Sequence, residues 1–337
     1  MTLHDSDPAT EIRGLINGYR VTQAIHVAVT LGIADLLILG SQTSDALAQA
    51  TKTHPPTLYR LLRALASANV LRELEDQRFE LTPLGDCLRA DAPDSMAGWA
   101  AHIGRSYQWQ AWTGLLHSVQ TGETAFQHIY GTDVWTYRST RPEESAIFDR
   151  AMTSVTVQSS AAVVGAYNFG RFQSIVDIGG GHGALLAGIL KAYQDLKGIL
   201  FDQPHVVAGA STLLEEAGLA DRCQIVAGNF FESVPNGADA YVLKAVIHDW
   251  QDAESIRILS VIRHTINAEG TLLLIERLIE PPNEGQEAKF SDLNMLVNTS
   301  GQERTRAEFA ALLEAAGFRL TQVVRSGMYS VLEALPI

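Results

Sequence analysis

Apolar residues recur at the spacing of one helix face through much of the first half of the chain. Between Glu11 and Leu37 this spacing predicts a long helix, which Gly32 and Gly40 are expected to divide. The segment from 95 to 165 is also predicted to be helical and is rich in aromatic side chains, most of which we assign to a core. The first half of the chain is therefore expected to be mainly helical.

A compact unit is predicted between residues 44 and 82. A short helix, Ser44–Ala50, is followed by a prolyl turn at residues 54–56 and by a second helix whose leucines fall on one face. Two strands, Val70–Leu74 and Phe79–Thr82, then alternate around a polar turn. Helix, turn, helix and hairpin in this order are typical of a winged-helix module.

From Phe172 onward, short apolar strands alternate with helices. The predicted strands are Ser174–Ile178, Gly198–Asp202, Gln224–Ala227, Ala240–Leu243 and Thr271–Ile275, and the predicted helices include Leu185–Tyr193, Glu254–Ile266 and Thr305–Ala316. This alternation is typical of an α/β fold with a mostly parallel, doubly wound sheet. Two final strands, Phe318–Val324 and Ser330–Ala334, are expected to add an antiparallel hairpin at one edge.

Length and composition narrow the classes of protein. A chain of 337 residues is too long for a single hydrophobic core of ordinary size. We divide it into a winged-helix-like domain at 1–100, a helical linker region at 101–170 and an α/β domain at 171–337.

The net charge of −13 argues against nucleic acid or an anionic membrane as a partner. Two cysteines exclude a multi-cysteine zinc module and fit a reducing compartment. Because no signal peptide or membrane-spanning apolar run is evident, a cytoplasmic protein is expected.

The winged-helix pattern is compatible with DNA binding and with protein–protein packing. A module that reads DNA needs a basic face to neutralise phosphates. Residues 1–100 hold eight Lys and Arg against twelve Asp and Glu, so this region is acidic. We therefore favour a packing or dimerisation module over a DNA-binding one.

A glycine-rich loop follows the first strand of the predicted sheet. It begins at Asp177 and contains Gly179, Gly181 and Gly183. Glycines here let a ligand approach the backbone closely, and the helix N-terminus behind them favours an anionic group. The next strand ends at Asp202, where a carboxylate can accept hydrogen bonds from both hydroxyls of a ribose. Together these features predict a cofactor that contains a nucleoside.

The loop by itself fits more than one cofactor. The pattern Gly179-x-Gly181-x-x-Ala184 also matches the dinucleotide fingerprint. Asp177, two residues before the glycines, and Gly183, at the helix entrance, favour S-adenosylmethionine instead. A tight turn without any ligand is the third interpretation.

A second candidate segment, residues 241–250, follows the fourth strand of the predicted sheet. It contains Lys244 and His248, and the carboxyl end of a strand faces the ligand crevice in a doubly wound sheet. Histidine is the side chain best suited to accept a proton near neutral pH, so His248 is a candidate base. By its pattern alone it fits better a histidine at a helix start or on the surface, and its position at the crevice makes the two interpretations equal.

Five motifs then occur in order at compatible spacing. They are VDIGGGHG at 176–183, FDQPH at 201–205, GNFF at 228–231, LKAVIHDW at 243–250 and ERT at 303–305. Together they resemble the plant caffeate-type O-methyltransferase family, which includes bacterial enzymes of secondary metabolism. The resemblance covers nearly the whole chain. It implies a Rossmann-like catalytic domain that binds S-adenosylmethionine, a winged-helix-like dimerisation domain before it, and hence a homodimer.

The resemblance also implies which residues bind the cofactor. Gly179 would contact its methionine part and Asp202 its ribose, Asn229 and Phe230 would flank the adenine, and Lys244 would lie nearby. The family usually has an acid where this chain has Asn229, so altered contacts with the adenine are expected there.

The catalytic residues implied by the resemblance are His248 as the base and Glu276 and Glu303 as two carboxylates that flank and orient it. A methyl sulfonium needs a nucleophilic oxygen held in line with the S–CH3 bond, and a base to take the proton of the hydroxyl. It needs no metal, and no metal ligand is assigned.

The acceptor is expected to be a small aromatic metabolite with a hydroxyl group, most simply a phenol. In the family its pocket lies between the helices before the Rossmann-like domain and the loop after the fifth strand. We assign to this pocket Trp112, Met152, Met295 and Asn298. The segment 298–302 is one residue shorter than in plant members and has one glycine instead of a pair, so this wall is expected to differ.

Three other functions remain open from the sequence. A protein of this fold that has lost methyl transfer would have no need of His248 and Glu303. A winged-helix regulator that senses a metabolite is disfavoured by the acidic N-terminal region. A nicotinamide-dependent oxidoreductase is disfavoured because the segment from Lys244 to His248 has no role in hydride transfer.

Overall fold

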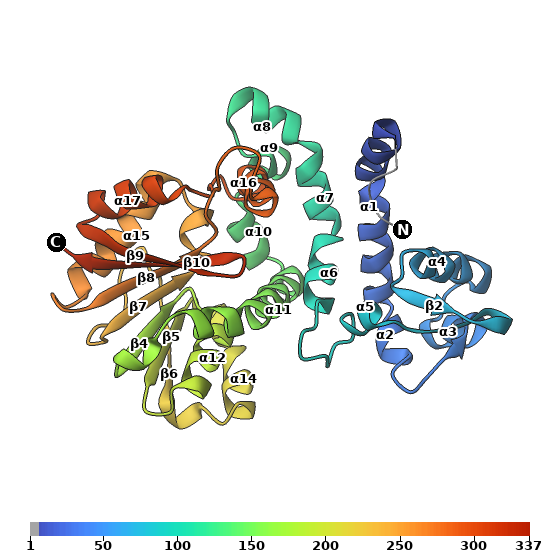
Figure 1. Cartoon of the computed structure of the whole chain (residues 1–337), viewed down its shortest axis with the longest axis horizontal. Helices are drawn as coiled ribbons and strands as arrows, with labels where there is room; N and C mark the ends of the chain where they lie inside the picture. The colour runs from blue at the N-terminus through green and yellow to red at the C-terminus, as the bar shows by residue number, and fades with distance from the viewer. Residues whose placement is uncertain (1–6) are drawn as a thin grey trace. The chain divides into compact units, whose positions relative to one another are not determined.

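The computed structural model describes residues 7–337, which form two compact units, one ending at Trp109 and the other comprising Gln110–Ile337 (Figure 1). The first unit combines helices with a small antiparallel sheet of order β1-β3-β2. Its elements are α1 (Pro8–Thr30), α2 (Ile33–Leu36), β1 (Gln42–Thr43), α3 (Ser44–Thr51), α4 (Pro55–Ser67), β2 (Leu71–Glu73), β3 (Arg78–Leu81), α5 (Pro83–Asp86) and α6 (Ala97–Ile103). Helix α7 (Ser106–Thr113) spans the boundary between the units.

The predicted winged-helix pattern is present in this unit. Helices α3 and α4 are followed by the β2–β3 hairpin, and the leucines on one face of α4 are buried against Phe79. Gly32 has a positive φ of 67° and separates α1 from α2, as expected for a glycine that interrupts a helix. The core of the unit therefore forms from the apolar periodicity seen in the sequence.

The second unit is an α/β domain with a seven-stranded sheet. Its strands are β4 (Ser174–Ile178), β5 (Lys197–Asp202), β6 (Cys223–Ala227), β7 (Ala240–Lys244), β8 (Thr271–Glu276), β9 (Phe318–Ser326) and β10 (Tyr329–Pro336). Its helices, after α7, are α8 (Leu115–Thr121), α9 (Ala125–Tyr130), α10 (Val134–Ser139), α11 (Pro142–Ala166), α12 (Ala184–Ala192), α13 (Pro204–Val207), α14 (Ala210–Glu216), α15 (Asp252–Thr265), α16 (Gln286–Asn298) and α17 (Arg306–Ala315).

The strand order is β6-β5-β4-β7-β8-β10-β9. Strands β4 to β8 are parallel, and β10 and β9 add the antiparallel hairpin at the edge, which confirms the predicted fold class. The chain runs from β4 outward to β5 and β6 and then returns to β7 on the other side of β4. The carboxyl ends of β4 and β7 therefore form the topological switch point, where ligands bind in sheets of this kind.

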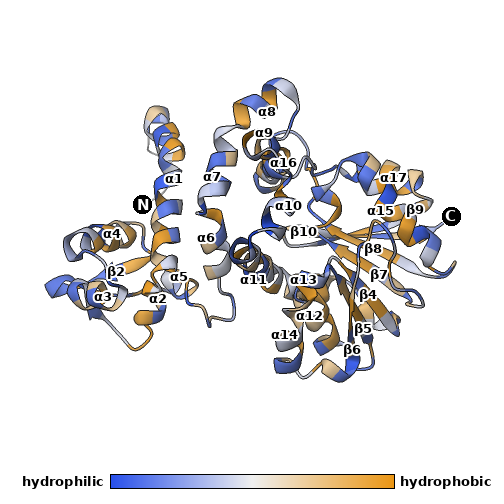
Figure 2. Cartoon of the chain, turned by 180° about the vertical axis from the view of Figure 1, so that it is seen from behind, coloured by the Kyte–Doolittle hydropathy of each residue, from blue (hydrophilic) through white to orange (hydrophobic). Residues whose placement is uncertain are grey.

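Helices cover both faces of this sheet. On one face α12 and the end of α11 pack with Ile175, Val242 and Ile275, and on the other α15 and α17 pack with Tyr241 and Leu274. Strands β7 and β8 carry the hydrophobic colour along most of their length, as expected for strands buried on both faces (Figure 2). The rigid sheet thus fixes the loops at its carboxyl edge.

One helix was not assigned from the sequence. The chain leaves β8 at Glu276, and residues 286–298 form helix α16. Its apolar residues are interspersed with Asp292, Asn294 and Asn298, so its periodicity is weak, and it contacts α8 and α9. Tertiary packing, rather than local pattern, accounts for this helix. Within residues 7–337, no helix combines the length and apolar character that crossing a membrane requires.

Candidate active site

The glycine loop joins β4 to α12 at the switch point. Gly179 and Gly181 have positive φ values of 67° and 60°, which glycine adopts without strain. A Cβ on Gly179 would lie 2.8 Å from a methyl carbon of Val246, whereas at Gly181 no described atom lies within 4 Å of the Cβ position. The loop thus packs against the segment that follows β7 on one side and leaves space on the other.

Two carboxylates flank this loop. Asp177 is buried, and its Oδ2 atom has no hydrogen-bond partner among residues 7–337. Burial, and then the negative charge of Asp202, raise the pKa of Asp177 to about 7. Asp202 accepts hydrogen bonds from the backbone N–H groups of Gly181 at 2.8 Å and Gln203 at 2.6 Å, and burial raises its pKa.

An unpaired buried carboxylate oxygen is costly, and a bound ammonium group would satisfy it. S-adenosylmethionine carries such a group on its methionine part. Asp177 and Asp202 can therefore hold the amino and ribose ends of this cofactor, with the glycine loop between them. The donor and acceptor groups at this edge fit the cofactor that the sequence implies.

Lys244, the last residue of β7, lies beside this edge. Its ammonium group donates to Thr156 Oγ1 on α11 at 3.3 Å and lies 4.4 Å from the centre of the Tyr329 ring. Burial, and then the positive charge of Arg277, lower the pKa of Lys244 to about 8. A cation in this position complements the negative charges of Asp177 and Asp202.

Asn229 and Phe230 follow β6. The Asn229 side chain accepts from the backbone N–H of Phe231 at 3.0 Å and donates to Glu232 at 3.1 Å. These two hydrogen bonds stabilise the turn in which Asn229 itself lies. Phe230 makes an edge-to-face contact with Trp250, with ring centres 6.1 Å apart. Phe230 thus lies near the segment that bears His248, while Asn229 is engaged locally.

His248 is buried in a short 3-10 turn, Ile247–Asp249, just after β7. Its Nδ1 atom lies 2.9 Å from Glu303 Oε1 and 3.7 Å from Glu276 Oε2, while its Nε2 atom lies 3.8 Å from Asp249 Oδ1. Both glutamates are therefore on the Nδ1 side of the ring. The tautomer with Nδ1–H donating to Glu303 leaves Nε2 as the atom that can accept a proton.

The two glutamates have different local roles. Glu276 Oε1 accepts from the backbone N–H groups of Val246 at 3.2 Å and Ile247 at 2.9 Å, so it fixes the turn that carries His248. Glu303 Oε1 instead binds the imidazole and also accepts from Ser291 Oγ on α16 at 2.7 Å. One carboxylate thus positions the backbone and the other positions the ring.

Charge in this cluster is strongly coupled. Burial alone would lower the pKa of His248, but the negative charges of Glu303, Glu276 and Asp249 outweigh it and raise the pKa to about 10. Burial raises the pKa of Glu276 to about 7, against the opposing effect of the imidazolium. The cluster stabilises a protonated imidazole, which is the state that follows removal of a proton from a substrate.

His248 can act as a base only after its ring has lost a proton, which the positive charge of bound S-adenosylmethionine favours. In the free protein, without that charge, we expect His248 to remain protonated at pH 8. Its folded pKa of about 10 exceeds the ordinary value of 6.5, so the folded state binds more protons over that range. The contribution of His248 to the free energy of unfolding is therefore fully present below about pH 6.5 and is lost as pH rises through about 10. NMR of 15N-histidine-labelled protein measures the titration, with His248→Asn to assign the signal. Glu303→Gln should shift the titration to lower pH. A wild-type signal that titrates at or below the ordinary value would contradict this prediction.

The sequence analysis did not identify Arg304 and Gly301, two residues that contact the backbone of the turn that carries His248. Arg304 is buried, and its guanidinium donates to the carbonyl oxygens of Ile247 at 3.3 Å and Trp250 at 2.9 Å. Gly301 lies where a Cβ would overlap the backbone of His248. The signals in the sequence were the arginine beside Glu303 and the single glycine in the shortened segment.

The predicted substrate residues are brought together only in part. The Trp112 indole N–H donates to Asn294 Oδ1 at 3.2 Å, and Asn298 Nδ2 donates to the same oxygen at 2.9 Å. Met295 is buried on α16 between these two asparagines, and Met152 is half-buried on α11. Asn294, which links Trp112 to Asn298, was missed because its spacing of four residues from Asn298 becomes meaningful only on a helix.

Comparisons with known proteins identify the family of this chain. The O-methyltransferase dimerisation domain matches residues 14–91, and the O-methyltransferase domain matches residues 112–319. The chain is 44% identical over 325 residues to phenazine O-methyltransferase PhzM of Lysobacter antibioticus, over 96% of this chain and 95% of that protein. The crystal structure of LaPhzM has a TM-score of 0.96 and 42% identity, over 98% of this chain and 100% of that chain.

A more distant solved structure is human N-acetylserotonin methyltransferase in complex with S-adenosylmethionine. Its TM-score is 0.91 at 28% identity, over 100% of this chain and 99% of that chain. The family resemblance carried by the sequence motifs is confirmed by these matches. The chain belongs to the O-methyltransferase family, with a dimerisation domain followed by a methyltransferase domain.

Proposed function

We propose that this chain transfers a methyl group from S-adenosylmethionine to a hydroxyl group of a small aromatic metabolite, with His248 as the base. The observation that carries the proposal is the buried contact of 2.9 Å between His248 Nδ1 and Glu303. His248 follows β7 at the topological switch point. The glycine loop and Asp177, which we assign to cofactor binding, lie at the same edge of the sheet. An oriented His–carboxylate pair at this edge suits removal of a proton from a hydroxyl.

The residues of this chain then have defined tasks. S-adenosylmethionine supplies the methyl group as an electrophile and leaves as S-adenosylhomocysteine. His248 Nε2 accepts the proton of the acceptor hydroxyl while the oxygen attacks, and Glu303 holds the ring in the required tautomer. Glu276 and Glu303 stabilise the imidazolium that results, and the proton then passes to water. Such a base contributes about 10²–10⁴-fold to the rate.

Aromatic side chains near the candidate base support a flat acceptor. Trp250, two residues after His248, lies nearly parallel to Trp135, with ring centres 6.1 Å apart and an angle of 20° between planes. The relative from Lysobacter antibioticus is named as a phenazine O-methyltransferase, and phenazines are planar aromatic molecules. We infer a planar hydroxylated aromatic as the acceptor class, with Trp112, Met152, Met295 and Asn298 as candidate contacts.

The cofactor is tested by calorimetric titration with S-adenosylhomocysteine, with NADH as the control. Micromolar binding of the first compound and none of the second is expected. Binding of NADH alone would favour the oxidoreductase interpretation of the glycine loop. A winged-helix regulator would instead shift genomic DNA fragments in a gel, which the acidic first unit does not favour.

We also propose that the chain forms a homodimer through its first unit. Helix α1 exposes a group of large apolar side chains: Ile12, Leu15, Ile16 and Tyr19 are each 50–70% exposed. An apolar surface of this kind is unusual on a helix that faces only solvent. The dimerisation domain matched at residues 14–91 includes most of this helix. The free thiols Cys87 and Cys223 fit the reducing cytoplasm as the proposed location.

Leu15→Glu is expected to weaken the dimer by more than tenfold. Burial of one leucine side chain is worth about 1.5–3 kcal/mol, and a symmetric interface loses it twice. Sedimentation equilibrium measures the dissociation constant. Leu39→Glu is the matched control, because Leu39 is 99% exposed outside α1 and gains the same charge. A monomeric wild type, or equal weakening by both variants, would refute this interface.

A further inference from the structure

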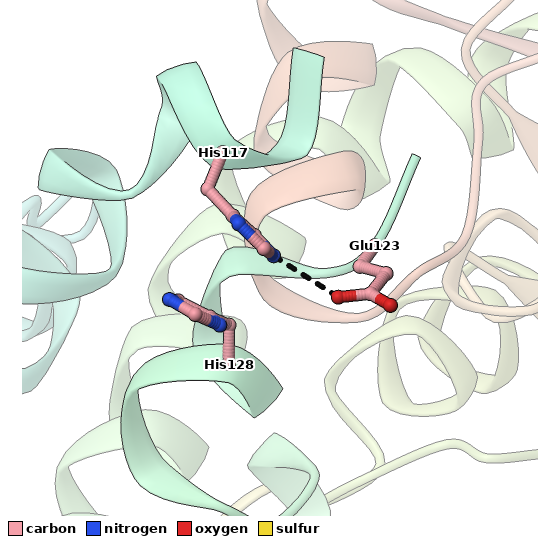
Figure 3. Close-up of side chains that lie close together, drawn as sticks. All are labelled: His117, Glu123 and His128. Carbon is pink, nitrogen blue, oxygen red and sulfur yellow. Dashed lines mark hydrogen bonds and ion pairs between the residues drawn. The ribbon is translucent and has the colours of Figure 1, made fainter. Parts of the chain in front are cut away.

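A cluster of two histidines and one glutamate lies outside the site described above. His117 is on α8, His128 is on α9, and Glu123 is in the turn between these helices (Figure 3). His117 Nε2 lies 3.1 Å from Glu123 Oε2, and the two imidazole rings are stacked with centres 3.7 Å apart. One nitrogen or oxygen atom from each residue lies within 4.8 Å of the others. An ordinary His–Glu hydrogen bond would account for two of these residues but not for the second imidazole.

The backbone that carries the cluster is well fixed. Gly122 ends α8 with a positive φ of 77°, and its N–H donates to Ser118 O at 2.8 Å. The Thr121 hydroxyl donates to His117 O at 2.8 Å and accepts from the Glu123 N–H at 3.1 Å. The inner faces of both helices are anchored, since Ser118 is buried on α8 and Phe126 is buried on α9. The three side chains therefore project from a turn that is already ordered.

We propose that His117, Glu123 and His128 bind a divalent transition-metal ion of the zinc class. Neutral imidazoles and a carboxylate are the ligands that Zn²⁺ takes in proteins, and imidazole is mostly neutral above about pH 7. Zinc–ligand bonds of about 2.1 Å place tetrahedral donor atoms roughly 3.4 Å apart. The donors here need to approach by at most about 1.4 Å. Because an imidazole nitrogen binds a metal in the plane of its ring, the two stacked rings must also turn so that both face one ion, and His128 and Glu123 are exposed side chains with room to do so. The fourth position is left to water.

A second His–Glu cluster in the described part of the chain, His248 with Glu276 and Glu303, is a weaker candidate for a metal site. Its carboxylates already accept from backbone N–H groups and from Ser291, and it forms the candidate active site. The cluster of His117 is instead half-exposed or exposed, and its ligands are accessible to an ion in solution.

Metal binding there has a structural consequence. Helices α8 and α9 both contact α16, which carries Ser291, Asn294 and Asn298. An ion that joins the two helices is expected to stabilise the folded state, because it binds that state and not the unfolded chain. This inference does not rest on the proposed reaction, since the ligands take no part in it.

The test is calorimetric titration of chelator-treated full-length protein with zinc chloride at pH 7.5. One zinc per chain is expected in the wild type, with affinity lowered about tenfold or more in His117→Asn, Glu123→Gln and His128→Asn. His264→Asn is the matched control, because it removes an exposed histidine on α15 and should leave the affinity unchanged. Zinc should also raise the thermal midpoint of the wild type but not that of Glu123→Gln.

Three results would overturn the proposal. The first is wild-type affinity that none of the three substitutions reduces. The second is an equal loss in His264→Asn, which would indicate general histidine binding. The third is one zinc per two chains with a zinc-dependent rise in mass, which would place the ion between chains.

Discussion

His248→Ala is expected to lower kcat for methyl transfer by about 10²–10⁴-fold while leaving the affinity for S-adenosylhomocysteine nearly unchanged. The imidazole is held through Nδ1 by Glu303 at 2.9 Å, which leaves Nε2 to accept a proton from an acceptor. The His248 ring contacts Glu303, Glu276 and Asp249, and none of these is among the residues that we assign to the cofactor, so removing the imidazole should leave the cofactor site nearly intact. Steady-state turnover and calorimetry of the same variant separate the two effects.

Two companion variants sharpen this test. Glu303→Gln keeps the shape but removes the charge that fixes the tautomer, so we expect a smaller loss of turnover with the same cofactor affinity. His264→Asn removes a histidine from the exposed side of α15 and should turn over as the wild type does. Turnover in His248→Ala that matches the wild type would rule out His248 as the base.

Gly301→Ala is expected to lower kcat by about 10²-fold, although residue 301 bears no reacting group. An added Cβ would overlap the backbone of His248 and Asp249, which is not a flexible side chain that can move aside. The turn must therefore shift and carry the imidazole away from its position. Overpacking of this kind also costs about 1–3 kcal/mol of stability.

Gly165→Ala is the matched control for this substitution. Gly165 lies in α11, its φ is not positive, and no described atom lies within 4 Å of its Cβ position. It should be neutral or slightly stabilising, because alanine favours a helix over glycine. Both variants are compared by turnover and by binding of S-adenosylhomocysteine, which reports whether the fold is intact. Full activity in Gly301→Ala would show that the position of the turn does not matter.

The sequence predicts the position of a site residue best where that residue stands at the end of a regular hydrophobic pattern. The strands that carry Asp177, Asp202 and Lys244 in their last two residues are short apolar runs, so the hydrophobic pattern by itself locates their carboxyl ends. The doubly wound pattern then places these residues at a common edge. His248 and Glu303 are 55 residues apart in the chain, and the family resemblance, rather than local pattern, links them.

The parts that escape prediction depend on tertiary contacts. Helix α16 has no strong apolar face, and a loop in its place would leave Ser291 and Asn294 without defined positions. Arg304 reads as a surface charge in the sequence, yet it is buried because carbonyl oxygens of the His248 turn and Asp252 satisfy its donors. The difference between Glu276 and Glu303, one binding backbone and the other the ring, is likewise a matter of three-dimensional geometry.

The central claim, base-assisted methyl transfer to an aromatic hydroxyl, is tested most directly by identifying the methylated product. Wild-type protein is incubated with S-adenosylmethionine and a hydroxylated phenazine, with the corresponding amino and thiol compounds in parallel. Mass spectrometry and NMR identify the methylated atom, and S-adenosylhomocysteine is quantified. The account predicts an O-methyl ether formed with one equivalent of S-adenosylhomocysteine, and a much slower reaction in His248→Ala. Methylation of the amine or thiol alone, or an equally fast reaction in His248→Ala, would contradict it.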